Sequence, residues 1–84
     1  MDASLDDALP PAPEGWTRHV SSSAREVEYR LTIGRAARAK LTIRAAADGG
    51  FRLESKRGCR ILSETTADSV ETAAATARDA LQRA

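Results

Sequence analysis

Two neighbouring stretches of the chain alternate strictly between apolar and polar residues, and this pattern limits the fold more than any other feature. The apolar positions of residues 26–33 are Val27, Tyr29, Leu31 and Ile33. Those of residues 38–44 are Ala39, Leu41 and Ile43. Because successive side chains of a strand point to opposite faces, each stretch has one buried and one solvated face. Joined at residues 34–37, the two stretches predict an antiparallel hairpin.

Similar patterns on both sides of this hairpin indicate further strands. Residues 48–50 (Asp-Gly-Gly) and residues 57–58 (Arg-Gly) have the composition of tight turns. Phe51 and Leu53 alternate with polar residues after the first turn, and Cys59 and Ile61 do so after the second. Odd positions are therefore expected to face the core in all four strands. Residues 16–20 are a candidate for a short additional strand at the start of the domain.

The last part of the chain is expected to form a helix. Asp68 and Glu71 have the spacing of a capping box, with Asp68 as the N-cap. An apolar stripe follows at helical spacing, formed by Val70, Ala73, Ala74, Ala77, Ala80, Leu81 and Ala84. The predicted fold is α+β: a four-stranded, or with residues 16–20 five-stranded, antiparallel meander with one C-terminal helix packed on one face.

Residues 1–15 differ in composition from the remainder. They contain three prolines and four carboxylates without Lys or Arg, which favours a disordered or polyproline-like tail. Residues 16–84 are then a single domain. As an alternative, the tail is an acidic arm that folds over a basic sheet and competes with its ligand.

Charge is segregated along the chain. Residues 16–62 hold eleven Lys and Arg against four Asp and Glu, whereas the segments on both sides are acidic. Projecting the even-numbered strand residues away from the helix gives a basic open face. Its candidate binding residues are Arg30, Arg38, Lys40, Arg44, Arg52, Lys56 and Arg60.

No catalytic or cofactor-binding motif is found, so the sequence indicates a non-enzymatic protein without a cofactor or metal. The single cysteine excludes an internal disulfide, and Cys59 is expected in the core. His19 has no second ligand at metal-binding spacing. No apolar run is long enough to cross a membrane, and no export signal is present, so a cytoplasmic protein is expected.

Two functions fit the basic face. The first is binding to the phosphate backbone of DNA or RNA, since the aromatic residues have core parity and leave no stacking platform on the open face. The second is docking, as an adaptor or inhibitor, on an acidic protein surface. In this second function the protein is a possible homodimer, and Leu62 is the large apolar residue at an outward position.

Overall fold

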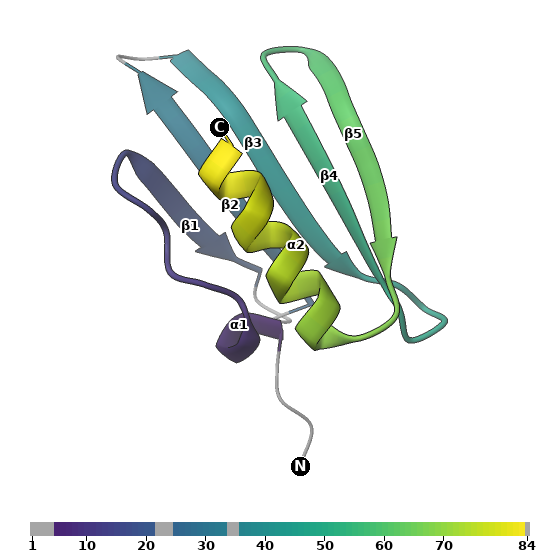
Figure 1. Ribbon diagram of the computed structural model, residues 1–84. Helices are drawn as coiled ribbons and strands as arrows, with labels where there is room; N and C mark the ends of the chain where they lie inside the picture. Colours follow the sequence, from purple (N-terminus) through teal and green to yellow (C-terminus); the bar gives the residue numbers. More distant parts are fainter. Residues whose placement is uncertain (1–4, 22–24, 34–35, 84) are drawn as a thin grey trace.

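The computed structural model describes residues 5–21, 25–33 and 36–83. It contains one antiparallel sheet with the strand order β1-β2-β3-β4-β5 and a C-terminal helix on one of its faces (Figure 1). The strands are β1 (Trp16–Val20), β2 (Glu26–Ile33), β3 (Ala36–Ala45), β4 (Phe51–Arg57) and β5 (Arg60–Ala67). The helices are α1 (Leu5–Ala8) and α2 (Val70–Arg83). The predicted α+β meander is confirmed, and residues 16–20 supply its fifth strand.

The two turns predicted from glycine connect β3 to β4 and β4 to β5. The turn expected at residues 34–37 is corrected, because Ala36 and Ala37 lie in β3 and pair with β2. Gly49 and Gly58 have φ angles of 92° and 61°, in the left-handed region where glycine is free of the Cβ clash. The Asp48 side chain accepts a hydrogen bond of 3.0 Å from the Gly50 amide. These local features set the hairpin registers on which the two sheet faces depend.

The core lies between the sheet and α2. Val27, Tyr29 and Ile43 are the largest side chains that are completely buried. Ala73 and Ala77 of α2 are also fully buried, because alanine lets the helix backbone approach the sheet closely. The predicted apolar stripe of α2 from Val70 to Leu81 is therefore the face that packs on the strands; Ala84, its last predicted member, lies outside the described residues.

Helix α2 begins one residue later than a cap at Asp68 implies. The Ser69 hydroxyl accepts a hydrogen bond of 3.2 Å from the Thr72 amide. This contact to the third helical residue is the one that an N-cap makes. The predicted cap is corrected to Ser69, and Glu71 lies in the first turn without closing a capping box with Asp68.

The structure differs from the expected tail in residues 5–15, while residues 1–4 of that tail lie outside the described residues. Leu5 and Leu9 are buried in the core cluster, and the Tyr29 hydroxyl donates a hydrogen bond to the Pro10 carbonyl. Helix α1 contacts α2 and β2, so this segment packs on the helix-covered face. The described part of the acidic segment does not lie across the basic open face.

Strand β5 is the second departure from the expected pattern. Ser55 pairs with Ser63, but Lys56 pairs with Ile61, so Leu62 is an extra residue in β5. This bulge interrupts the alternation and turns the residues before it to the other face. Ile61 therefore lies opposite Lys56 and is 52% exposed. Cys59 is exposed in the turn, and the predictions that Cys59 and Ile61 face the core are wrong.

Candidate binding face and groove

The open face, which is the sheet face opposite α2, is organised in rows of side chains that cross the strands. Residues paired across an antiparallel sheet share a face, so the registers define each row. The first row consists of Thr17, Arg30, Lys40, Lys56 and Ile61. The second consists of His19, Glu28, Thr42, Glu54 and Glu64. The third consists of Glu26, Arg44, Arg52 and Thr66.

The basic first row lies directly beside the acidic second row, and ion pairs connect them. Glu28 is 2.5 Å from the Arg30 guanidinium and 3.8 Å from the Lys40 ammonium. Glu54 is 3.5 Å from the Lys56 ammonium. Each of these cations is thus partly neutralised by a carboxylate on the same sheet face. Such exposed pairs contribute little to stability, about 0–1 kcal/mol each.

The third row carries one further ion pair. Arg44 and Glu26 lie opposite each other on β3 and β2 and approach to 2.8 Å. The hydrogen bond and the charge of Glu26 raise the pKa of the Arg44 guanidinium above its ordinary value. Arg52 is paired in register with Arg44 and forms no ion pair with any described residue. Arg52 is therefore the cation of this row that is available to a ligand.

A hollow of about 480 Å³ lies at the hairpin end of the open face, next to the β4–β5 turn. The cations that line it are Arg30, Lys40 and Lys56, and its remaining lining comes from Ala39, Gly58 and Cys59. No carboxylate lines this hollow. Farther along the face, a smaller hollow of about 220 Å³ contains Glu26, Glu28 and Glu54 as well as cations. The charged groups that line the hollow at the hairpin end are therefore all cations, although Glu28 and Glu54 contact them from outside its lining.

The seven predicted residues are not all brought together. Arg30, Lys40, Arg44, Arg52 and Lys56 share the open face, as expected. Arg38 is exposed and is the extra residue at an irregularity between β2 and β3. Arg60 pairs in register with Arg57, whose row lies on the helix-covered face. The assignment of Arg60 to the open face is therefore corrected, because the bulge at Leu62 changes its side.

The aromatic residues lie on the other face, as the sequence predicted. Tyr29 is completely buried, and Trp16 and Phe51 pack against the core. Arg18, which is paired with Tyr29, places its guanidinium 5.9 Å from the centre of that ring. In the part of the chain that the structure describes, the open face therefore offers charged groups, hydroxyls and the exposed His19 imidazole to a ligand, and no Phe, Tyr or Trp ring on which a base could stack.

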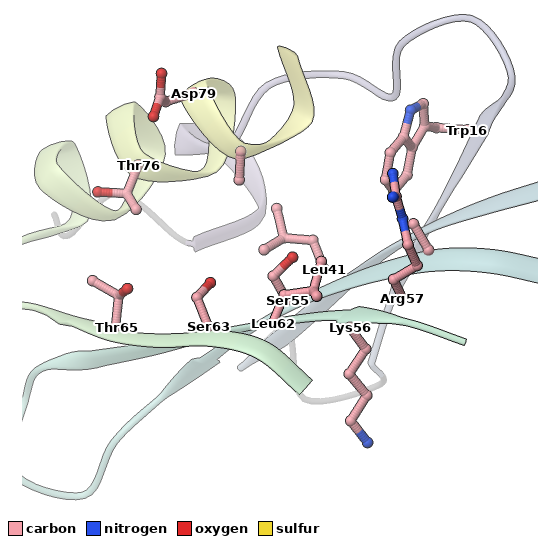
Figure 2. A pocket seen from close by; sticks show the side chains of 12 residues that line it. Trp16, Leu41, Ser55, Lys56, Arg57, Leu62, Ser63, Thr65, Thr76 and Asp79 are labelled. Atoms are coloured by element: carbon pink, nitrogen blue, oxygen red, sulfur yellow. The ribbon is translucent and has the colours of Figure 1, made fainter. Parts of the chain in front are cut away.

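Sequence reasoning missed a groove on the helix-covered face, between α2 and the β4–β5 hairpin (Figure 2). Its volume is about 480 Å³. Apolar lining comes from Trp16, Ala39, Leu41, Leu62 and Ala80, and hydroxyl groups come from Ser55, Ser63, Thr65 and Thr76. Lys56, Arg57 and Asp79 complete the lining. The available sequence signal was Ser55, a polar residue at an inward position of β4.

Other kinds of site are not found in the part of the chain that the structure describes. No group of three or more His, Cys, Asp or Glu side chains there is arranged to hold a metal ion. No helix within the described ranges is long and apolar enough to cross a membrane. Searches against protein-family models, curated proteins and solved structures give no match to this chain.

Proposed function

We propose that the protein is a small non-enzymatic binding module that holds the phosphate backbone of nucleic acid on its open face. The observation that supports this most is the hollow at the hairpin end, which Arg30, Lys40 and Lys56 line without a carboxylate. Arg52 adds an exposed guanidinium group to the same face. Guanidinium and ammonium groups on neighbouring strands suit phosphate oxygens, because they make charge-assisted hydrogen bonds.

The expected ligand is a duplex bound without regard to sequence. Cations on a sheet face contact backbone phosphates, whereas recognition of single strands generally uses aromatic stacking. The neighbouring glutamates limit the strength of binding, since Glu28 and Glu54 compete with phosphate for the same cations. We expect dissociation constants of roughly 1–100 µM at physiological salt, the range of non-specific binding. We also propose that the protein is located in the cytoplasm.

Salt dependence is the direct test. The affinity of the full chain for random-sequence duplex DNA and RNA is measured by fluorescence anisotropy over a series of salt concentrations. Three to four phosphate contacts give a slope of log K against log salt of about −3 to −4 for DNA. Lys40→Gln and Lys56→Gln should weaken binding and make this slope shallower by about one unit each. A slope near zero, or absence of binding at low salt, would dismiss the proposal.

Cys59 provides a second readout that does not depend on affinity. It is exposed and lines the hollow next to the three cations. A bound duplex should slow its alkylation by a maleimide, and added salt should restore the rate. Free cysteine in the same mixture is the control for an effect of DNA on the maleimide reaction itself, and its rate should be unchanged. Unchanged reactivity of Cys59 at saturating DNA would place the duplex elsewhere on the protein.

Docking on an acidic protein is the second candidate, and one observation favours it specifically. Strand β5 forms an edge of the sheet, and Ile61 and Leu62 are 52% and 55% exposed there. Unpaired edge strands are common sites of strand addition by a partner or by a second copy. If wild type is a dimer through this edge, Leu62→Asp should be a soluble monomer by light scattering. Unchanged dimerisation of this variant would exclude Leu62 from the interface.

A further inference from the structure

We propose that the groove between α2 and the β4–β5 hairpin binds a small anionic amphiphile. Its acidic group would lie against Arg57 and Arg60, and its apolar part would lie along the groove floor. This site is on the helix-covered face and is separate from the nucleic-acid surface proposed above. Its volume, about 480 Å³, is within the range of small-molecule sites, roughly 300–1,000 Å³.

The first argument is an uncompensated pair of like charges. Arg57 and Arg60 are directly opposite each other on β4 and β5. Like charges in this position destabilise a sheet. On the open face, Lys40 and Lys56 are also opposite each other, but Glu28 and Glu54 neutralise them. Neither Arg57 nor Arg60 forms an ion pair with any residue that the structure describes. A bound carboxylate would supply the missing negative charge.

The second argument is the position of this arginine pair relative to apolar surface. Trp16, Leu31, Ala39, Arg57 and Arg60 form a single row across all five strands. Trp16, Ala39 and Arg57 all line the groove, and Figure 2 shows Trp16 and Arg57 at the same end of it. The small side chain of Ala39 leaves space between the larger ones. An anion at the arginines would thus have apolar contacts immediately beside it.

The third argument is the character of the remaining groove. Leu41 and Leu62 supply apolar surface to the groove, and Leu62 is 55% exposed. Hydroxyl groups of Ser55, Ser63 and Thr65 line the sheet side. Asp79 is the carboxylate on the α2 wall, and in Figure 2 it projects from the helix away from Trp16 and Arg57. A ligand with an acid at one end and a short apolar chain fits this distribution of charge.

Decanoate is the probe for this proposal, used below the concentration at which it forms micelles. Trp16 is the only tryptophan of the chain, so its fluorescence reports directly on groove occupation. We expect saturable binding with a dissociation constant of about 0.1–1 mM, given typical binding energies per heavy atom. Decanol, which has the same chain without the charge, should bind several-fold more weakly. Equal binding of decanol and decanoate, or no saturable change in fluorescence, would overturn the proposal.

Matched substitutions test the role of the arginines. Arg57→Gln and Arg60→Gln should each weaken decanoate binding about three- to tenfold, because each removes a charge-assisted contact. Arg52→Gln is the control, since Arg52 is an exposed arginine on the opposite face. It should leave decanoate binding unchanged. Wild-type affinity in the Arg57→Gln/Arg60→Gln double variant would refute the anion site.

Filling the groove provides the independent test. Thr76→Phe on α2 should reduce decanoate binding more than tenfold by occupying the space next to Ser63 and Thr65. Circular dichroism checks that this variant is folded. If it is not folded, the Arg57→Gln and Arg60→Gln variants test the anion site instead, because both arginines are exposed. Salt titration with duplex DNA measures binding at the open face, which is a separate site. Failure of decanoate to bind therefore leaves the nucleic-acid proposal intact, and the reverse also holds.

Discussion

The β2–β3 hairpin and the β4–β5 hairpin are built from strands of similar length, but they differ in burial and in the pairing of their charges. In the first, Val27, Tyr29, Leu41 and Ile43 are buried under α1 and α2. In the second, Leu53 is buried, but the next inward position is Ser55, and all of β5 except Ala67 is exposed. The cations of β2 and β3 on the open face pair with Glu26 or Glu28. Arg57 and Arg60 of the second hairpin lack such partners among the described residues.

The formation of a strand and the formation of a core are therefore separate events in this protein. Seven of the eight residues of β5 pair with β4, so the strand forms on one side without an apolar inner face. Its helix-side positions carry Ser63 and Thr65, whose burial would offer little favourable transfer energy. Helix α2 therefore packs where the apolar residues are, and the β5 side of the same face is left to form the groove.

The largest expected effect contrasts one buried and one exposed isoleucine. Ile43→Ala on β3 removes a completely buried side chain and should lower the free energy of unfolding by about 2–4 kcal/mol. Ile61→Ala on β5 changes a side chain that is 52% exposed and should cost less than about 1 kcal/mol. Urea denaturation measures both. Similar losses in the two variants would mean that β5 contributes to the core as much as β3 does.

The second prediction concerns residues 5–15, the segment that packs on the helix-covered face beside β2. Leu9→Ala should lower the free energy of unfolding by about 2 kcal/mol, because Leu9 is buried in the core cluster. Pro11→Ala is the control, since Pro11 lies in the same segment and is exposed. Denaturant unfolding again provides the measurement. A Leu9→Ala variant as stable as Pro11→Ala would contradict the packing of this segment against the sheet.

The third prediction, with a smaller expected effect, concerns a substitution that makes the β4–β5 hairpin resemble the β2–β3 hairpin. Ser55→Val replaces the polar residue at an inward position of β4 with an apolar, β-branched one. It should raise the free energy of unfolding by about 0.5 kcal/mol through strand propensity and apolar burial. Ser63→Val, at the paired position of exposed β5, should give a smaller gain. Destabilisation by Ser55→Val would indicate that the serine hydroxyl is needed in the groove.

The smallest effect on stability should come from the ion pairs of the first hairpin. Glu28→Gln removes the carboxylate that contacts Arg30 and Lys40 and should cost less than about 1 kcal/mol. The same change should strengthen duplex binding about two- to fivefold, since it frees both cations for phosphate. Glu71→Gln, an exposed carboxylate on α2, is the control and should leave binding unchanged. Weaker binding by Glu28→Gln would contradict competition between this carboxylate and phosphate.

Much of the candidate site could be predicted because it depends on alternation within single strands. Five of the seven predicted cations lie on the open face as expected, and Arg30, Lys40 and Lys56 form one row. Arg60 was predicted on the wrong face, since its side depends on a bulge that parity counting does not detect. The same bulge exposes Ile61. The groove was not predicted, because it depends on where a single helix lies across a sheet of five strands.

The sequence by itself determined the α+β class, the order of the strands, the glycine turns after β3 and β4, and the apolar face of the C-terminal helix. These features follow from local chemistry: alternation, glycine in turns and helical spacing of alanines. Only the tertiary structure decided that Leu5 and Leu9 join the core, that Glu28 contacts Arg30 and Lys40, and that β5 stays exposed. Each of these outcomes depends on register and on packing between residues distant in the chain, which local pattern does not encode.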